Sequence, residues 1–176
     1  MKAQKIAVTG ILAAIICLFA PFSIPTGAVP LSLATFAVYI IACISEPKRA
    51  TSAVLIYVLL GAAGVPVFSS FRGGFHIIAG ATGGYIIGYI PCALIISLLT
   101  KKLSDKNFIY PLSMILGTLA CYLIGTVWYS VQAGASFTAA LSVCILPFII
   151  GDIIKIAAAS ALGITLKKHG IRSLTK

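Results

Sequence analysis

The sequence has 176 residues, of which 60% are hydrophobic and 9% are charged, and its mean hydropathy is +1.12. No soluble domain of this length buries so much apolar surface, so the composition excludes a water-soluble fold and indicates that lipid is the solvent. The formal net charge of +10 would suggest nucleic-acid binding in a soluble protein, but in a membrane protein the positions of the basic residues are more informative, and we expect no nucleic-acid partner.

Six apolar segments, separated by glycine, proline and charged residues, predict the transmembrane helices of the chain. Their expected ranges are 5–20, 31–45, 50–63, 84–99, 110–131 and 147–168. A shorter helix is expected at 137–145, before Pro147, which suits the first turn of the last helix. The predicted fold is therefore all-α, a polytopic membrane protein in which residues 1–176 form a single bundle of six transmembrane helices.

The first segment has a basic start and a long apolar run, as a signal peptide does, but no convincing small-residue cleavage site follows it. We therefore expect it to be retained. Within it, Gly10 and Ala14 have the spacing that lets two membrane helices approach closely. Gly84 and Gly88 repeat this spacing in the fourth segment. Either pair could serve internal packing only.

The basic residues predict the orientation of the bundle in the membrane. An even number of spans places both termini on one side, and 11 of the 13 lysines and arginines fall at the termini or in the second and fourth loops. Only Arg72 falls in an opposite loop, and Lys155 falls inside a span. Because basic residues are enriched in cytoplasmic loops, we expect both termini to be cytoplasmic and the protein to be a multi-pass protein of the cell membrane.

Two outer loops, residues 21–30 and 64–83, adjoin the short second and third segments, each of which gives only about 22 Å of helix. The loops are nearly uncharged and rich in proline or glycine. Irregular backbone at membrane depth is tolerated only where protein buries it or where it lines a cavity. We therefore expect both loops to enter the outer half of the membrane and to form the walls of a pocket.

The second outer loop has the glycines of a phosphate cradle but lacks the Gly-Lys-Ser/Thr ending, so we reject a nucleotide P-loop. Arg72 in this loop is either an ordinary interfacial arginine or a bidentate clamp for a carboxylate. His76 has no neighbouring cysteine, glutamate or second histidine, which argues against a metal site. Tyr57 and Tyr85 flank the loop and are expected to face inward.

Asp152 and Lys155 lie inside the last apolar segment, three residues apart and therefore on one face of a helix. A charge at this depth costs at least ~2.5 kcal/mol, so each needs a partner or a wet cavity. Lys155 lies roughly 20 Å of helix from the cytoplasmic end of the segment, level with the outer loops. The two side chains either form a purely structural ion pair or hold a polar ligand between helices.

The remaining reactive residues indicate neither catalysis nor metal binding. Glu46, Asp105 and Asp152 are the only acids, so no exposed pair of catalytic carboxylates is available. The five cysteines are scattered singly through apolar segments without a Cys-x-x-Cys motif, so we interpret them as core or lipid-facing residues.

Several of these motifs together resemble the BioY family, the biotin-specific substrate-binding subunits of energy-coupling factor (ECF) transporters. The resemblance extends over nearly the whole chain and is carried by IPTGAVPL at 24–31, GVPVF at 64–68, RGG at 72–74, GATGGY at 80–85 and PFIIGDIIK at 147–155. The chain departs from the family pattern at Ala34, Phe71 and Ala81, where the family usually has glutamine, glycine and proline, respectively.

The resemblance implies a binding site for biotin and no cofactor. It implies that Asp152 accepts hydrogen bonds from the ureido N–H groups, that Lys155 donates to a ligand oxygen, and that Arg72 suits the tail carboxylate. Further candidate lining residues are Thr35, Tyr57, Thr82 and Tyr85.

The resemblance also implies protein partners. The chain has no Walker motif and therefore has no means of hydrolysing ATP by itself. Members of the family work with a transmembrane coupling subunit and two ATP-binding subunits. We expect the small residues of the first helix, Gly10, Ala13 and Ala14, to dock on the coupling subunit.

Three alternatives remain at this point. The chain could bind another vitamin within the same kind of transporter. It could be an intramembrane enzyme with Asp152 as a general base, although no second catalytic group is visible in the sequence. It could also be a structural scaffold, in which a Leu–Leu replacement of the buried pair would increase stability and lose no ligand.

Overall fold

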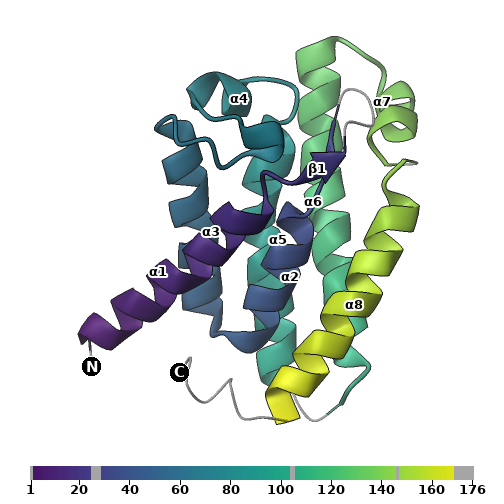
Figure 1. Cartoon of the computed structure of the whole chain (residues 1–176). Coiled ribbons are helices and arrows are strands. Elements are labelled where there is room, and N and C mark those ends of the chain that lie inside the picture. Colours follow the sequence, from purple (N-terminus) through teal and green to yellow (C-terminus); the bar gives the residue numbers. More distant parts are fainter. Residues whose placement is uncertain (1, 25–28, 104–105, 146, 169–176) are drawn as a thin grey trace.

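The computed structural model describes residues 2–24, 29–103, 106–145 and 147–168, which form a helical bundle (Figure 1). The long helices are α1 (Lys2–Phe19), α2 (Ala34–Ile44), α3 (Pro47–Ala62), α5 (Gly83–Lys102), α6 (Ile109–Ala133) and α8 (Ile149–Lys168). Each overlaps one of the six predicted segments. The start of α1 and the end of α8 lie at the same end of the molecule (Figure 1). Residues 25–28, Asp105 and the basic residues Arg172 and Lys176, on which part of the sequence analysis relied, lie outside the described residues.

Helix length separates two groups among these helices. The segments Gly83–Lys102, Ile109–Ala133 and Ile149–Lys167 are long and apolar enough to cross a membrane. The apolar parts of α1 and α2, Ala3–Phe19 and Ala34–Ile44, are shorter, and α3 has 16 residues, with Lys48 and Arg49 in its first turn. Among the described residues, three helices are therefore able to cross a membrane by their length and composition.

The two predicted outer loops contain short regular elements that the sequence analysis did not expect. In the first, β1 (Ser23–Ile24) pairs antiparallel with β2 (Leu31–Ser32), with Ser23 opposite Ser32. In the second, a 3₁₀ turn (Ser69–Phe71) and α4 (Phe75–Ala79) precede α5. These elements satisfy backbone N–H and C=O groups locally, which a bare loop near the membrane core would leave unpaired. Helix α7 (Phe137–Cys144) lies near the predicted range of the short seventh helix.

Helix α5 packs closely against α6 because glycines lie at their interface. A Cβ atom on Gly88 would lie 3.0 Å from Sγ of Cys121, and one on Gly84 would lie 2.3 Å from Cβ of Trp128. The Gly84–Gly88 spacing noted in the sequence therefore serves packing within the chain. Trp128 also donates a hydrogen bond from Nε1 to the carbonyl oxygen of Gly80, 2.9 Å away, which ties the second outer loop to α6.

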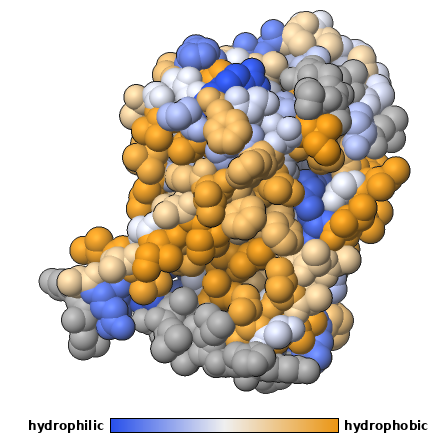
Figure 2. All heavy atoms as spheres, viewed as in Figure 1, coloured by the Kyte–Doolittle hydropathy of each residue, from blue (hydrophilic) through white to orange (hydrophobic). Residues whose placement is uncertain are grey.

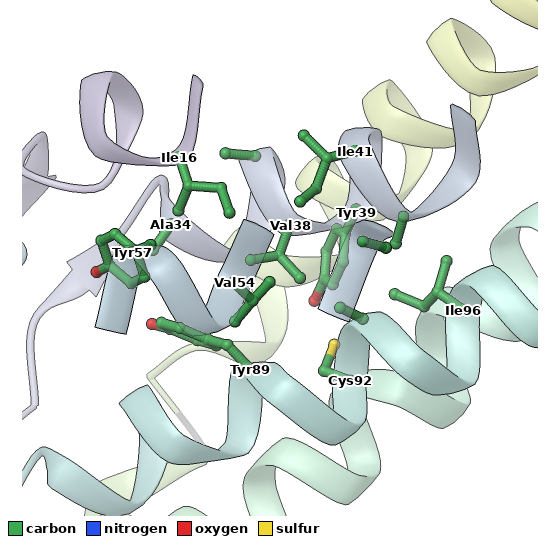
Figure 3. Close-up of a cluster of buried hydrophobic side chains, with 14 of the residues drawn as sticks. Ile16, Ala34, Val38, Tyr39, Ile41, Val54, Tyr57, Tyr89, Cys92 and Ile96 are labelled. Carbon is green, nitrogen blue, oxygen red and sulfur yellow. The ribbon is translucent and has the colours of Figure 1, made fainter. Parts of the chain in front are cut away.

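Apolar side chains fill the centre of the bundle and also cover its outside. Ile16 of α1, Val38 of α2 and Val54 of α3 are fully buried in one cluster with Tyr57 and Tyr89 (Figure 3). On the surface, hydrophobic residues spread over the middle of the molecule, and the hydrophilic residues visible in this view lie mainly toward its two ends (Figure 2). The N-terminal half of α1 projects away from the bundle (Figure 1), and its Ile6 and Ile11 are exposed.

Candidate substrate-binding site

The two charged residues of the last helix lie in the first turns of α8 and point into the protein. Asp152 is 5% exposed and Lys155 is 8% exposed. Nζ of Lys155 lies 2.5 Å from Oδ1 of Asp152, so the two form a buried ion pair. The carboxylate is further favoured by its place in the first turn of α8, where the helix dipole is positive.

Side chains from two other helices complete this pair. Tyr122 of α6 donates a hydrogen bond to Oδ2 of Asp152. Lys155 donates from Nζ to Oγ1 of Thr35, 2.8 Å away on α2, and to the carbonyl oxygen of Ser32, 3.2 Å away on β2. Oδ1 of Asp152 is buried, and the ammonium of Lys155 is in contact with it. Because a carboxylate oxygen has two acceptor lone pairs, Oδ1 can accept a further hydrogen bond.

A cavity with about 450 Å³ of empty space, open solvent included, lies beside the pair. Its walls come from the first outer loop and from α2, α5, α6 and α8, and consist of Val29, Pro30, Leu31, Ser32, Thr35, Tyr39, Tyr85, Tyr89, Cys92, Thr118, Cys121, Tyr122, Phe148, Asp152 and Lys155. The site is therefore mainly apolar and aromatic, with two opposite charges on one wall.

A second cavity, of about 330 Å³, adjoins the first and shares Val29, Pro30, Tyr85 and Tyr89 with it. Arg72 and Thr82 line this second cavity and do not line the first. The guanidinium of Arg72 is exposed and donates from Nε to the carbonyl oxygen of Ser69, 3.3 Å away. The two predicted polar groups thus lie next to the ion-pair cavity, separated from the pair by tyrosine side chains.

Of the seven residues predicted to bind substrate, Tyr57 lies apart from both cavities. Its side chain is 1% exposed and packs edge-to-face on Phe68, with ring centroids 5.6 Å apart. The expectation that Tyr57 lines the pocket is corrected, because its face of α3 packs in the apolar core. Tyr85, which flanks the same loop, does line both cavities.

The predicted docking residues on α1 do not share one face. Gly10 and Ala14 are exposed, and no atom lies within 4 Å of a Cβ built on Gly10. Ala13 is 2% exposed and belongs to the core. Only Gly10 and Ala14 are therefore available to a partner protein, because a helix turns by about 100° per residue and adjacent positions face different ways.

Several lining residues were missed by the sequence analysis. Tyr122 is the most important, since it contacts the carboxylate directly. Tyr39 and Thr118 also line the cavity and form a hydrogen bond of 2.5 Å between their hydroxyl groups. A signal was present in α6, where Thr118, Cys121 and Tyr122 recur at helical spacing among leucine and isoleucine. His76 is exposed on α4, and no cluster of three metal-ligating side chains occurs among the described residues.

Comparisons with known proteins place this geometry in context. The profile of the BioY family matches residues 1–172. The biotin transporter BioY of Thermotoga maritima is 38% identical over 159 residues, which cover 90% of this chain and 93% of that protein. Biotin transporter BioY2 of Lactococcus lactis subsp. cremoris is 32% identical over 154 residues, covering 88% and 85%. The fold is similar to a crystal structure described as the S-component for biotin from an ECF-type ABC transporter, with a TM-score of 0.86, 27% identity and coverage of 95% of this chain and 92% of that one.

Proposed function

The chain belongs to the BioY family, and from this premise we propose that it is a biotin-binding subunit that captures biotin outside the cell and delivers it to the cytoplasm within an ECF-type uptake complex. The observation that carries the proposal is the buried Asp152–Lys155 pair on the wall of a mainly apolar and aromatic cavity. The relatives and the structural neighbour are transport proteins, which does not favour an intramembrane enzyme.

The chemistry of biotin fits the two adjoining cavities. Its ureido ring has two N–H donors and one carbonyl, which suit the acceptor capacity left on Asp152 and the ammonium of Lys155. Its sulfur ring is apolar and suits the aromatic walls. Its tail ends in a carboxylate, which would reach past Tyr85 toward Arg72 and Thr82 in the second cavity. Hydrogen bonds to charged groups in such a buried site are costly to leave unmade, so binding should be selective.

The membrane arrangement that we propose has six spans, both termini in the cytoplasm and the two outer loops facing outside, in the cell membrane. Support comes from the basic residues at the termini and in the second and fourth loops. For energy the chain would depend on a transmembrane coupling subunit and two ATP-binding subunits, since its sequence has no Walker motif. The exposed Gly10 and Ala14 on α1 are the proposed contact with the coupling subunit.

Native mass spectrometry of protein purified from biotin-supplied cells tests the ligand. We expect biotin to be retained, and a panel of other vitamins not to displace it. Asp152→Ala and Lys155→Ala should each abolish retention, whereas the matched controls Glu46→Ala and Lys106→Ala, whose residues line neither cavity, should leave it intact. Unchanged biotin retention in both site variants would disprove the assignment of Asp152 and Lys155 to the binding site. Preferential binding of a different vitamin would show that this vitamin, and not biotin, is the ligand.

A further inference from the structure

A further hollow lies between the start of α3 and the end of α5, on the side that we propose to be cytoplasmic. It is open to the outside, with about 1,990 Å³ of empty space, open solvent included, and it shares no lining residue with the two substrate cavities. The residues that line it are Glu46, Pro47, Lys48, Thr51, Ser52, Leu94, Leu98, Leu99, Lys101 and Lys102. We call it the basic groove. The proposed biotin binding makes no use of it.

Positive charge gathers at one end of the basic groove. Lys101 is held by Glu46, with Nζ 3.1 Å from Oε1. Lys48 and Lys102 are exposed, and neither has an ion-pair partner among the residues that the structure describes. The groove therefore presents two ammonium groups, one from each of its two helices, with the hydroxyls of Thr51 and Ser52 one turn further along α3.

The rest of the basic groove is apolar and open to the outside. Leu94 is 38% exposed and Leu98 is 49% exposed. With Lys101 and Lys102 they follow one another at helical spacing along one side of α5. The distance from Leu94 to Lys102 is about 12 Å of helix. An apolar stripe of that length ending in cations has the shape and polarity of a fatty chain attached to an anionic headgroup.

We infer that the basic groove binds an anionic phospholipid, with the phosphate between Lys48 and Lys102 and an acyl chain along Leu94 and Leu98. Charge complementarity supports this occupant, since basic pockets between membrane helices favour anionic headgroups. The exposed leucines lie on a helix that is long and apolar enough to span the bilayer, so lipid reaches them without any partner. The inference does not depend on which vitamin, if any, the substrate cavity holds.

Native mass spectrometry of the full chain from nanodiscs that contain phosphatidylcholine and phosphatidylglycerol tests the inference. The wild type should retain phosphatidylglycerol in preference to phosphatidylcholine. The double variant K48Q/K102Q should lose that preference on the order of tenfold or more, since each lysine near an anionic surface contributes about a factor of five. The single variant K102Q should be intermediate. Excess inorganic phosphate should not displace the lipid, because the apolar stripe also contributes to binding.

The double variant K5Q/K106Q is the matched control, because it removes the same charge from exposed lysines outside the groove. It should retain the wild-type preference, and biotin retention should be normal in both doubles, which shows that they are folded. The inference would be overturned if both double variants lost the preference for phosphatidylglycerol equally, or if the wild type showed no such preference. It would also be overturned if inorganic phosphate displaced the bound lipid. Retained lipid with loss of co-purifying transporter subunits in K48Q/K102Q would overturn it as well, since the groove would then dock a protein. Absence of biotin from every sample, wild type included, would refute the proposed function; thermal unfolding would then show whether the doubles are folded, and the lipid result would still test the groove.

Discussion

The two halves of the bundle bury their side chains in different ways. On the side of α1 and α3, Ile16, Val54 and Tyr57 are at most 1% exposed and lie in one apolar cluster (Figure 3), where Tyr57 packs edge-to-face on Phe68. On the side of α8, the buried groups include an ion pair, and a cavity remains open beside it. The first half is filled by side chains, and the second half is arranged around an unfilled space.

The difference indicates that folding and binding are divided between the halves. Close apolar packing stabilises the α1–α3 half. A buried ion pair is weak support for stability, because removing two charges from water costs about as much as their attraction returns. The pair on α8 is therefore better explained by binding than by folding. Substitutions in the two halves should accordingly separate stability from affinity.

Breaking the ion pair should have the largest effect. Asp152→Leu leaves the ammonium of Lys155 buried and unbalanced, and should reduce the free energy of unfolding by about 3–5 kcal/mol. The double replacement Asp152→Leu with Lys155→Leu should recover most of that stability. Neither protein should bind biotin. Thermal unfolding in detergent measures the stability of both variants, and a binding assay measures their affinity for biotin. A double variant as unstable as the single one would contradict the division of folding and binding between the two halves.

Crowding the apolar half should lower stability and leave affinity unchanged. A Cβ atom at Gly61 would lie 2.1 Å from Cζ of Phe68, whose ring is 1% exposed and held against Tyr57. Gly61→Ala should therefore cost about 1–3 kcal/mol of stability. Gly10→Ala is the matched control, since no atom lies within 4 Å of its added Cβ. Loss of biotin affinity in folded Gly61→Ala protein would show that the two halves are coupled.

Removing one hydroxyl from the cavity side should weaken biotin binding more than it lowers stability. Tyr122→Phe deletes the donor to Oδ2 of Asp152 and should weaken biotin binding about tenfold, the lower end of what a hydrogen bond to a charged group contributes. Its melting temperature should fall less than that of Asp152→Leu, because the ion pair with Lys155 remains. Tyr129→Phe alters a residue on the same helix that does not line the cavity. Isothermal titration of both variants makes the comparison, and equal affinities would remove Tyr122 from the site.

The smallest effect is expected at the surface, where Glu46 at the start of α3 pairs with Lys101 at the end of α5. The hydrogen bond from Lys101 lowers the pKa of Glu46 below its ordinary value. A lowered folded-state pKa stabilises the protein above the unfolded pKa, and this contribution is lost as pH falls through the folded value. Because Glu46 and Lys101 are both more than a third exposed, Glu46→Gln should cost less than about 0.5 kcal/mol at neutral pH. Melting curves of wild type and variant should converge in acid and in high salt.

The sequence alone predicted the helices and the two buried charges, because long apolar runs and isolated charges are local signals. Asp152 and Lys155 stood out as charges within an apolar segment. The rotation of each helix was not readable. Tyr57 and Tyr85 flank the same loop, yet Tyr57 is held by Phe68 and Tyr85 faces the cavity. Tyr122 was missed because its role depends on the position of α8, which only tertiary packing determines.

The placement of both charges on one helix has an electrical consequence. Asp152 and Lys155 are less than one turn apart on α8, so any tilt or slide of that helix carries them together. Moving a single elementary charge across a membrane involves about 2.3 kcal/mol per 100 mV of potential. The paired side chains sum to zero, so their displacement transfers no gating charge. The pair itself would therefore add no dependence on the membrane potential to a reorientation of α8.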